Sequence, residues 1–600
     1  MIQNHSDSNN PMQAGAAKGG LSSHSGNQWQ HRVNSTVYSP NGAILFSESS
    51  FHDQAIFLSD GITTVRYQDL PTVIQNAHHQ FQNLCNSRKL EKPPSACVAG
   101  IDTTNRFESI LWMVYCWVHA IPFVPFCADN PEPVTQFLPE VLLVTSDETL
   151  IHPHIKKAAN GAQAISDLTI PGKSLAEKTL QNYGTGVSLP LPGAHLPFTD
   201  QPRALFCGLL TSGSSGRPKR VALLRKNMIA ATRNSFRDIR PDSDAGEHLW
   251  GNCLPLHHTG GLSIIFRALL SGTGVFLWNR FDAGSILDAL HGNPSIKRIS
   301  LVPTMLKRLV DCSQKSGITS PAKLQQILTG GGPSSPELIR HVRNMGWPVC
   351  FSYGMTETCG QIASQNTDGS SPFASVGLPF PDHDIVIRDD TGKAASTGMV
   401  GALHVRGPQL FPGYLPDSAR LSDFDLKKMD FSSDDPDLTT HSSNPASGGW
   451  FRTGDYARLD KQGNLYIEAR RTDLIVSGGE NVNPVEVESI LLKCADIADA
   501  GISGLPDEEW GQLVVAFIVP KIRNSKGTKD TFQTREEDPA GVQAQYSETQ
   551  QRIFHFISNN LKPHQRPKKI GFTDSLPRTS LGKLERKKLQ DQIKVRFFQK

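Results

Sequence analysis

The sequence has little excess charge and no long uninterrupted apolar run, and each absence excludes a class of protein. Lysine and arginine number 60 against 57 aspartates and glutamates, a formal net charge of +3, so no electrostatic footprint for nucleic acid is predicted. The most apolar stretch, residues 110–127, is interrupted by His119, Pro122 and Pro125. It falls short of the roughly 20 apolar residues that span a bilayer. We therefore expect no nucleic-acid partner and no transmembrane segment, and a core helix followed by a strand at this position.

Paired cysteines are also missing. The ten cysteines stand singly, with no CxxC pair, which argues against a zinc ribbon or a disulfide framework. We therefore expect a reducing, cytoplasmic compartment. Residues 1–36 are polar and lack the apolar core of a secretory signal, so we expect a disordered extension there.

Residues 37–469 show the pattern of an α/β domain. Apolar strand-like runs alternate with helix-like segments, which is typical of parallel sheets covered by helices. The strand-like runs include residues 204–210, 274–278, 299–302 and 349–352, and a helix-like segment covers 336–344.

The chain is long enough for more than one domain, since 600 residues exceed the roughly 100–200 residues typical of one. Residues 470–600 carry their own strand and helix signals, at 514–519 and 553–559. We expect a large N-terminal domain of mostly parallel sheets covered by helices and a small mobile α+β C-terminal domain. Polar surface inserts are expected at 421–449 and 524–548.

A loop rich in glycine and hydroxyl groups follows the run 204–210. It reads Thr211, Ser212, Gly213, Ser214, Ser215, Gly216, and Lys219 comes three residues later. The backbone N–H groups and hydroxyls of such a loop converge on an anion, and the lysine adds a point charge. No Lys-Ser or Lys-Thr pair has the Walker A spacing, which disfavours a P-loop NTPase. Taken alone, the loop is equally compatible with a flexible Gly/Ser connection.

Five further segments follow in a fixed order: GGGP at 330–333, YGMTET at 353–358, WFRTGD at 450–455, RRTDLIVSGGEN at 470–481 and PRTSLGK at 577–583. Together with the loop they resemble the adenylate-forming enzymes, which comprise acyl-CoA synthetases, nonribosomal adenylation domains and luciferases. The resemblance covers about residues 40 to 590. It implies that a carboxylate attacks the α-phosphate of ATP and pyrophosphate leaves, which calls for Mg²⁺ and for cations at the developing charge.

The resemblance assigns roles at the phosphate end of the nucleotide. It implies that residues 211–216 and Lys219 hold the β- and γ-phosphates. Thr356 would contact the α-phosphate, and Glu357 would ligate Mg²⁺. Lys583 matches the lysine that bridges the carboxylate and the α-phosphate during adenylation.

At the nucleoside end, the resemblance places the adenine against Gly331, Gly332 and Tyr353. Asp455 would accept hydrogen bonds from both ribose hydroxyls, with Arg470 beside it. Each residue has an ordinary structural reading if taken singly, for example a turn residue for Asp455 or a core aromatic for Tyr353. The ordered set favours the functional interpretation.

The second half-reaction is implied to follow a rotation of the small domain, after which a thiol attacks the adenylate. Thr472 matches the hinge, although most relatives carry Asp or Lys there. Ser477, Gly478 and Gly479 resemble the backbone that borders the thiol channel after rotation. No carrier module follows residue 600, so free coenzyme A is the expected acceptor; its thiol attacks as the thiolate.

Three stretches, 254–267, 301–306 and 330–362, are similar to the o-succinylbenzoate–CoA ligases of menaquinone and phylloquinone synthesis. The second carboxylate of that acid needs a cation, and Arg267 is the candidate because it sits in an otherwise apolar helix, where an unpaired guanidinium is costly. The alternative is an arginine that snorkels to the surface. His258 matches the family histidine near the acyl site and is counted with the catalytic group, although packing or gating suits it better than base catalysis. His257 stands where relatives have an aromatic residue.

Two other functions stay open on the sequence alone. One is an aryl- or fatty-acyl-CoA ligase with a different acid. The other is a catalytically silent nucleotide-binding protein on the same fold. The presence of all the charged motif residues argues against this alternative. Nothing in the sequence fixes the oligomeric state.

Overall fold

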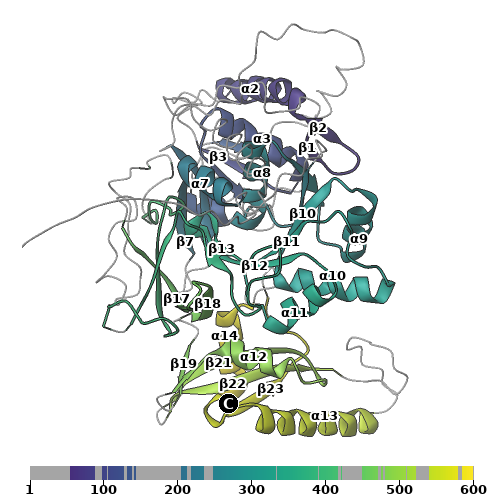
Figure 1. The fold of residues 1–600 in the computed structure, drawn as a ribbon, viewed down its shortest axis with the longest axis vertical. Helices are drawn as coiled ribbons and strands as arrows, with labels where there is room; N and C mark the ends of the chain where they lie inside the picture. Colours follow the sequence, from purple (N-terminus) through teal and green to yellow (C-terminus); the bar gives the residue numbers. More distant parts are fainter. Residues whose placement is uncertain are drawn as a thin grey trace, which may run out of the picture.

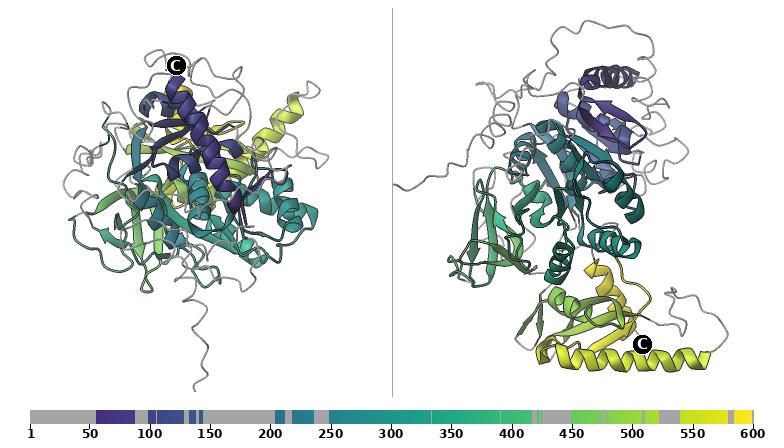
Figure 2. Two further views of the ribbon diagram at one scale, coloured as in Figure 1. Left: turned by 90° about the horizontal axis from the view of Figure 1, so that it is seen from above. Right: turned by 45° about the vertical axis from the view of Figure 1, so that its right-hand side comes forward.

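The strands fall into two bodies, one containing β1 to β18 and a smaller one containing β19 to β23 (Figures 1 and 2). The computed structural model describes residues 55–87, 98–104, 106–127, 132–137, 141–143, 204–211, 218–235, 248–332, 334–389, 391–416, 421, 424, 449–470, 474–477, 480–507, 510–521, 539–578 and 584–598. The predicted extension at 1–36 lies outside these residues.

A nine-stranded sheet is the largest layer, in the order β14-β13-β12-β11-β10-β8-β9-β1-β2. Its central strands run parallel to one another, from β1 through β9, β8, β10 and β11 to β12. The strands are β1 (Ile56–Ser59), β2 (Thr64–Arg66), β8 (Leu249–Asn252), β9 (Gly274–Leu277), β10 (Ile296–Leu301), β11 (Gln326–Thr329), β12 (Val349–Met355), β13 (Gly360–Ser364) and β14 (Leu378–Pro379). The three strands predicted within this sheet are therefore confirmed.

Helices connect these parallel strands. They are α8 (Thr259–Ser271), α9 (Ala283–Gly292), α10 (Pro303–Ser316) and α11 (Pro336–Asn344). The bounds of α11 match the prediction. Its start is fixed locally: Ser335 accepts a hydrogen bond from the backbone of Leu338, and Pro336 occupies the first helical position,.

A second, five-stranded sheet has the order β5-β3-β4-β6-β7. Its strands are β5 (Val141–Leu143), β3 (Ala99–Asp102), β4 (Phe123–Phe126), β6 (Leu205–Thr211) and β7 (Lys219–Leu224), and it lies with α2 (Leu70–Ser87), α3 (Arg106–Val118), α4 (Glu132–Phe137) and α7 (Arg225–Ser235). Every residue of α3 is buried. The helix and strand predicted for residues 110–127 are thus confirmed as α3 and β4.

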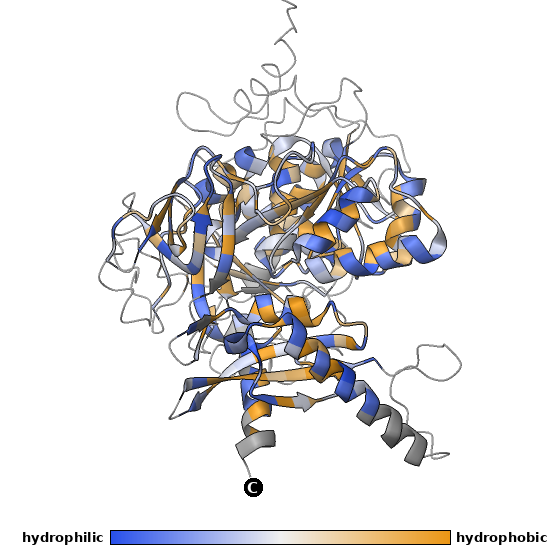
Figure 3. Cartoon of the chain, turned by 60° about the horizontal axis from the view of Figure 1, so that its bottom comes forward, coloured by the Kyte–Doolittle hydropathy of each residue, from blue (hydrophilic) through white to orange (hydrophobic). Residues whose placement is uncertain are grey.

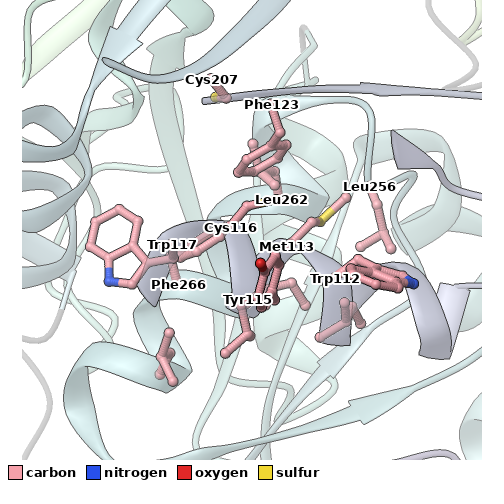
Figure 4. Close-up of a cluster of buried hydrophobic side chains, with 14 of the residues drawn as sticks. Trp112, Met113, Tyr115, Cys116, Trp117, Phe123, Cys207, Leu256, Leu262 and Phe266 are labelled. Atoms are coloured by element: carbon pink, nitrogen blue, oxygen red, sulfur yellow. The ribbon is translucent and has the colours of Figure 1, made fainter. Parts of the chain in front are cut away.

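Aromatic side chains join α3, α8 and the second sheet in one core (Figure 4). The ring of Phe266 on α8 lies 4.7 Å from that of Phe206 and 5.0 Å from that of Trp117. Truncating a buried aromatic to alanine typically costs about 3–5 kcal/mol. Helix α8 is therefore packed on several sides, and this packing fixes the positions of the polar residues on the helix.

A four-stranded antiparallel sheet completes the larger body. It contains β15 (Asp384–Arg388), β16 (Gly401–Arg406), β17 (Phe451–Leu459) and β18 (Leu465–Arg470). Most of the predicted insert at 421–449 precedes β17 and lies outside the described residues.

The smaller body has its own sheet and core, with hydrophobic residues concentrated in its strands (Figure 3). Its elements are β19 (Ile475–Ser477), β20 (Glu480–Val482), α12 (Pro484–Leu491), β21 (Ile497–Asp507), β22 (Gly511–Pro520), α13 (Pro539–Asn560), β23 (Lys569–Phe572) and α14 (Arg586–Phe598). Helix α13 begins well before the predicted 553–559 and takes up the end of the predicted insert at 524–548. The residues of this extension include few apolar ones, so the apolar stripe that indicates a helix in a sequence is too weak to detect there.

Two further expectations concern the compartment. No helix in the described part of the chain is long and apolar enough to cross a membrane. Eight cysteines whose side chains the structure describes are free thiols, at positions 116, 127, 207, 253, 312, 350, 359 and 494.

Candidate active site

A tight turn at the carboxyl end of β12 forms the centre of the site. It contains the 3-10 turn η6 (Thr356–Thr358), followed by Cys359 with φ of 53°. The buried Thr358 hydroxyl accepts from the Met355 N–H at 3.0 Å and donates to the Gly360 carbonyl at 2.6 Å. These hydrogen bonds of Thr358 fix the backbone of the turn. Thr356 and Glu357 are half-buried and lie at the end of the sheet.

The predicted phosphate loop is pinned at its two ends. Thr211 and Lys219 are paired across the β6–β7 hairpin, so residues 212–217 connect two adjacent strands; the loop itself lies outside the described residues. The Lys219 ammonium lies 4.8 Å from the ring centroid of Tyr414. The hydroxyl of the same tyrosine donates to Glu357 Oε1 at 2.9 Å. Two predicted site residues are thus brought together by a third that no sequence signal singled out.

At the nucleoside end, the Tyr353 hydroxyl donates to Asp455 Oδ2. Asp455 is 4% exposed and is paired with Arg470 between strands β17 and β18. An ionised carboxylate has about four acceptor sites, so ribose hydroxyls can still bind it. Gly331 has φ of +75°, in the left-handed region that favours glycine,.

The start of α8 carries the residues that the sequence predicts for the acyl side of the site. The Thr259 hydroxyl donates to Thr356 Oγ1 at 3.2 Å, so this helix end abuts the turn at β12. The rings of His257 and His258 lie 4.5 Å apart, and Thr103 Oγ1 lies 3.3 Å from His257 Nδ1.

Both histidines are held neutral. Burial lowers the pKa of His258. Burial lowers the pKa of His257 to about 3, and the neighbouring His258 and Arg106 act in the same direction. Neutral imidazoles suit a pocket wall, and the catalytic assignment of His258 stays a prediction.

Arg267 lies two turns further along α8 and is only 3% exposed, which excludes the snorkelling alternative. Its Nε has no hydrogen-bond partner among the described residues. Its guanidinium lies 5.7 Å from the Trp250 ring, and its Nη2 would lie 2.9 Å from a Cβ placed on Gly360. Burial lowers the pKa of Arg267 to about 10, and the nearby Cys359 partly opposes this shift. An anion-binding group is therefore buried next to Gly360, which follows Glu357 by three residues in the sequence.

A magnesium ion fits this arrangement only together with a phosphate ligand. No group of three or more His, Cys, Asp or Glu residues in the described part is arranged to hold a metal ion. Mg²⁺ is commonly held by one or two carboxylates plus substrate phosphates and waters. Glu357, beside Lys219, provides such a carboxylate.

Several predicted residues fall outside the described part of the chain. They are Ser212, Gly213, Ser214, Ser215, Gly216, Thr472, Gly478, Gly479 and Lys583. Ser477 is buried in β19. Arg578 and Leu584 form an isolated bridge, which brings together the two ends of the segment that contains Lys583.

Comparison with known proteins gives two family matches. Residues 134–415 match the AMP-binding enzyme family, and residues 486–583 match the AMP-binding enzyme C-terminal domain. The 2-succinylbenzoate--CoA ligase of Enterococcus faecalis is 32% identical over 391 residues, which cover 65% of this chain and 70% of that protein. The chain belongs to the AMP-binding enzyme family.

Solved structures of AMP-binding enzymes agree with the fold. The o-succinylbenzoate CoA synthetase (MenE) of Bacillus subtilis in complex with the acyl-adenylate intermediate superposes with a TM-score of 0.66 at 26% identity, covering 90% of this chain and 96% of that one. A double mutant of that synthetase bound to the product analogue OSB-NCoA gives a TM-score of 0.54, again covering 90% of this chain and 96% of that one.

Proposed function

We propose that the protein is an AMP-forming acid–thiol ligase that converts 2-succinylbenzoate to its coenzyme A thioester. In the first half-reaction the carboxylate attacks the α-phosphate of ATP and pyrophosphate leaves. In the second, the thiolate of coenzyme A attacks the acyl-adenylate and AMP leaves. The relatives that carry this activity by name are 31–33% identical to the chain.

The nucleotide half accounts for the first step through charge. Mg²⁺, when bound with ATP, neutralises phosphate charge and favours departure of pyrophosphate. Glu357 supplies the carboxylate that faces it, Lys219 adds a cation, and Thr356 offers a hydroxyl to the α-phosphate. Asp455 and Tyr353 hold the nucleoside, with Gly331 and Gly332 giving close approach to the base. Lys583 is proposed to stabilise the charge that develops as the carboxylate attacks.

The buried Arg267 is the observation that carries the choice of acid. Arg267 is 3% exposed and its Nε has no described partner. Its guanidinium has therefore lost hydration without gaining a full set of hydrogen bonds, which is costly. A second carboxylate on the substrate would satisfy it. An acid with one carboxylate would leave it unsatisfied.

The second step requires the smaller body to rotate. The better superposition on the acyl-adenylate complex than on the OSB-NCoA complex, 0.66 against 0.54, supports the view that this arrangement corresponds to adenylation. Lys493 on the smaller body and Glu337 on α11 form an ion pair of 3.1 Å across the two bodies in this arrangement. We place the hinge at Thr472, the domain boundary near residue 470 and the thiol channel along Ser477, Gly478 and Gly479.

We also propose a cytoplasmic, reducing location. The eight cysteines whose side chains the structure describes are free, as expected of a chain that meets glutathione rather than an oxidising compartment.

ATP–pyrophosphate exchange across a panel of carboxylic acids tests the proposal, followed by thioester assay with coenzyme A. Exchange that depends on 2-succinylbenzoate is the expected result. Exchange with benzoate or fatty acids alone would retain the ligase and overturn the substrate; no exchange with any acid would favour a silent nucleotide-binding protein.

Lys583→Ala separates the two half-reactions. It should abolish pyrophosphate exchange yet spare thioester formation from preformed acyl-adenylate, because the lysine stabilises charge only in the first transition state. Equal loss in both assays would mean that Lys583 is structural or also serves the second step.

A further inference from the structure

One tyrosine outside every sequence motif contacts two charged residues of the nucleotide half. The Tyr414 hydroxyl donates to Glu357 Oε1 at 2.9 Å, and its ring lies 4.8 Å from the Lys219 ammonium. No carboxylate within ion-pair distance of Lys219 occurs in the described part of the chain, so the tyrosine is the element that joins the two charges there.

The backbone on either side of Tyr414 is fixed to both partners' elements. Tyr414 bridges Val221 on β7, two residues after Lys219. The Leu415 N–H donates to the Arg220 carbonyl at 2.8 Å, and the Phe411 N–H donates to the Glu357 carbonyl at 2.8 Å. The segment therefore ties strand β7 to the turn η6, independently of any side chain.

The ring itself is held by neighbouring aromatics. Phe411, 1% exposed, meets the Tyr414 ring edge-on at 4.9 Å and the Phe451 ring at 5.2 Å. Such edge-to-face contacts are favourable beyond simple burial. The hydroxyl and the ring face are thus presented to Glu357 and Lys219 before any nucleotide binds.

We propose that Tyr414 is a positioning residue that fixes Glu357 and Lys219 relative to one another for the metal-bound triphosphate. The inference rests on the proposed function. The hydroxyl occupies one carboxylate oxygen and leaves the other for the metal, as hydrogen bonds to ligating carboxylates commonly do. The ring face holds the ammonium by a cation–π interaction and leaves its three N–H donors for phosphate oxygens.

The two contacts use different parts of the side chain, so substitution can separate them. Tyr414→Phe removes the hydroxyl and keeps the ring. Tyr414→Leu removes both while leaving an apolar side chain against Phe411. Binding of ATP, measured by calorimetry without metal and at increasing Mg²⁺, reads out the two effects without any acid or turnover.

Tyr414→Phe should raise the Mg²⁺ concentration for half-maximal ATP binding about tenfold to a hundredfold, the usual effect of losing a partner of a metal ligand. Its metal-free affinity for ATP should stay within twofold of the parent. Tyr414→Leu should show the same Mg²⁺ shift and, in addition, a metal-free affinity about twofold to fivefold weaker.

Tyr466→Phe is the matched control. Tyr466 also donates to a carboxylate, Asp460, at 3.1 Å, and its ring also lies against a cation, Arg458, at 3.9 Å, but on the β17–β18 hairpin. It should leave both affinities unchanged.

The inference is overturned if Tyr414→Phe leaves the Mg²⁺ dependence within twofold of the parent while its melting temperature is unchanged. It is also overturned if Tyr414→Phe weakens metal-free and metal-bound ATP equally, because that is the signature of a general loss of structure. If 2-succinylbenzoate supports no pyrophosphate exchange but Tyr414→Phe still raises the Mg²⁺ requirement for ATP binding, the proposed substrate is rejected and the role of Tyr414 is retained.

Discussion

Charge is placed differently in the proposed nucleotide half of the site and in its proposed acyl half. Lys219 and Glu357 are half-buried at strand ends, where water still solvates them before the nucleotide arrives. Arg267 is buried inside a helix at 3% exposure, and its pKa is lowered to about 10. Half-exposed charges bind an anion at modest net gain, whereas a buried unpaired charge penalises every ligand that fails to satisfy it. We therefore propose that affinity for ATP and selectivity for the acid arise in separate regions.

The largest expected effect comes from removing the buried charge. Arg267→Leu should lower kcat/KM for 2-succinylbenzoate roughly tenfold to a few thousandfold, because losing one partner of a buried charge pair costs on the order of 2–5 kcal/mol. Benzoate-like acids without the second carboxylate should be used no worse than by the parent. Steady-state kinetics with both acids and both proteins gives the coupling energy.

Arg298→Leu is the control for this change, since the Arg298 guanidinium lies 5.6 Å from the centroid of the same Trp250 ring and Arg298 is also buried. It should not discriminate between the two acids. A coupling energy within about 0.5 kcal/mol of zero for Arg267→Leu would mean that another residue binds the carboxylate.

A smaller effect should follow from displacing the same guanidinium without removing it. Gly360 has φ of +115°, and an added Cβ would lie 2.9 Å from Arg267 Nη2. Gly360→Ala should reduce kcat/KM for 2-succinylbenzoate about tenfold to a hundredfold, as a misplacement of about 1 Å can do, and should affect monocarboxylic acids less.

Gly398→Ala provides the comparison, because Gly398 also has positive φ, +84°, but open space around its Cβ position. It reports the backbone strain alone. Equal kinetic losses in the two variants would show that Gly360 matters through strain rather than through Arg267.

In the nucleotide half a single lost hydrogen bond should matter less. Tyr353→Phe removes the donor to Asp455 and should raise KM for ATP about threefold to tenfold, with kcat little changed. Pyrophosphate exchange at varied ATP measures this. A loss as large as that of Arg267→Leu would remove the distinction between the two halves.

The smallest effect concerns pH. Burial lowers the pKa of His257 to about 3, from about 6.5 in the unfolded chain. A depressed folded-state pKa means that stability is complete above about pH 6.5 and is lost as the pH falls from there toward 3. Allowing for partial solvent screening, the loss by pH 4.5 is about 1–2 kcal/mol.

His257→Gln should therefore lose less free energy of unfolding than the parent between pH 7 and pH 4.5. Urea unfolding at both pH values measures this loss. His291→Gln, at an exposed position near the end of α9, should follow the parent. If the two variants respond to acid alike, His257 is more solvated than its surroundings indicate.

The sequence predicted the parts of the fold whose signals are local. Alternation of apolar runs predicted strands of the parallel sheets, and Ser335 with Pro336 marked the start of α11 because capping depends on neighbours within one turn. The start of α13 was missed, because the polar residues before 553 give no apolar stripe long enough to detect.

The candidate site divides in the same way. Motif order indicated Lys219, Glu357, Asp455 and the reaction class, because each chemistry needs a particular residue type in a particular turn or helix. Arg267 was proposed from its place in an otherwise apolar segment and from the likeness of that segment to one family of ligases. The tertiary structure decided that Arg267 is buried rather than snorkelling, and that Tyr414 joins Lys219 to Glu357. Burial and contacts between residues almost 200 positions apart depend on how sheets and helices pack, and no local pattern in the sequence records that packing.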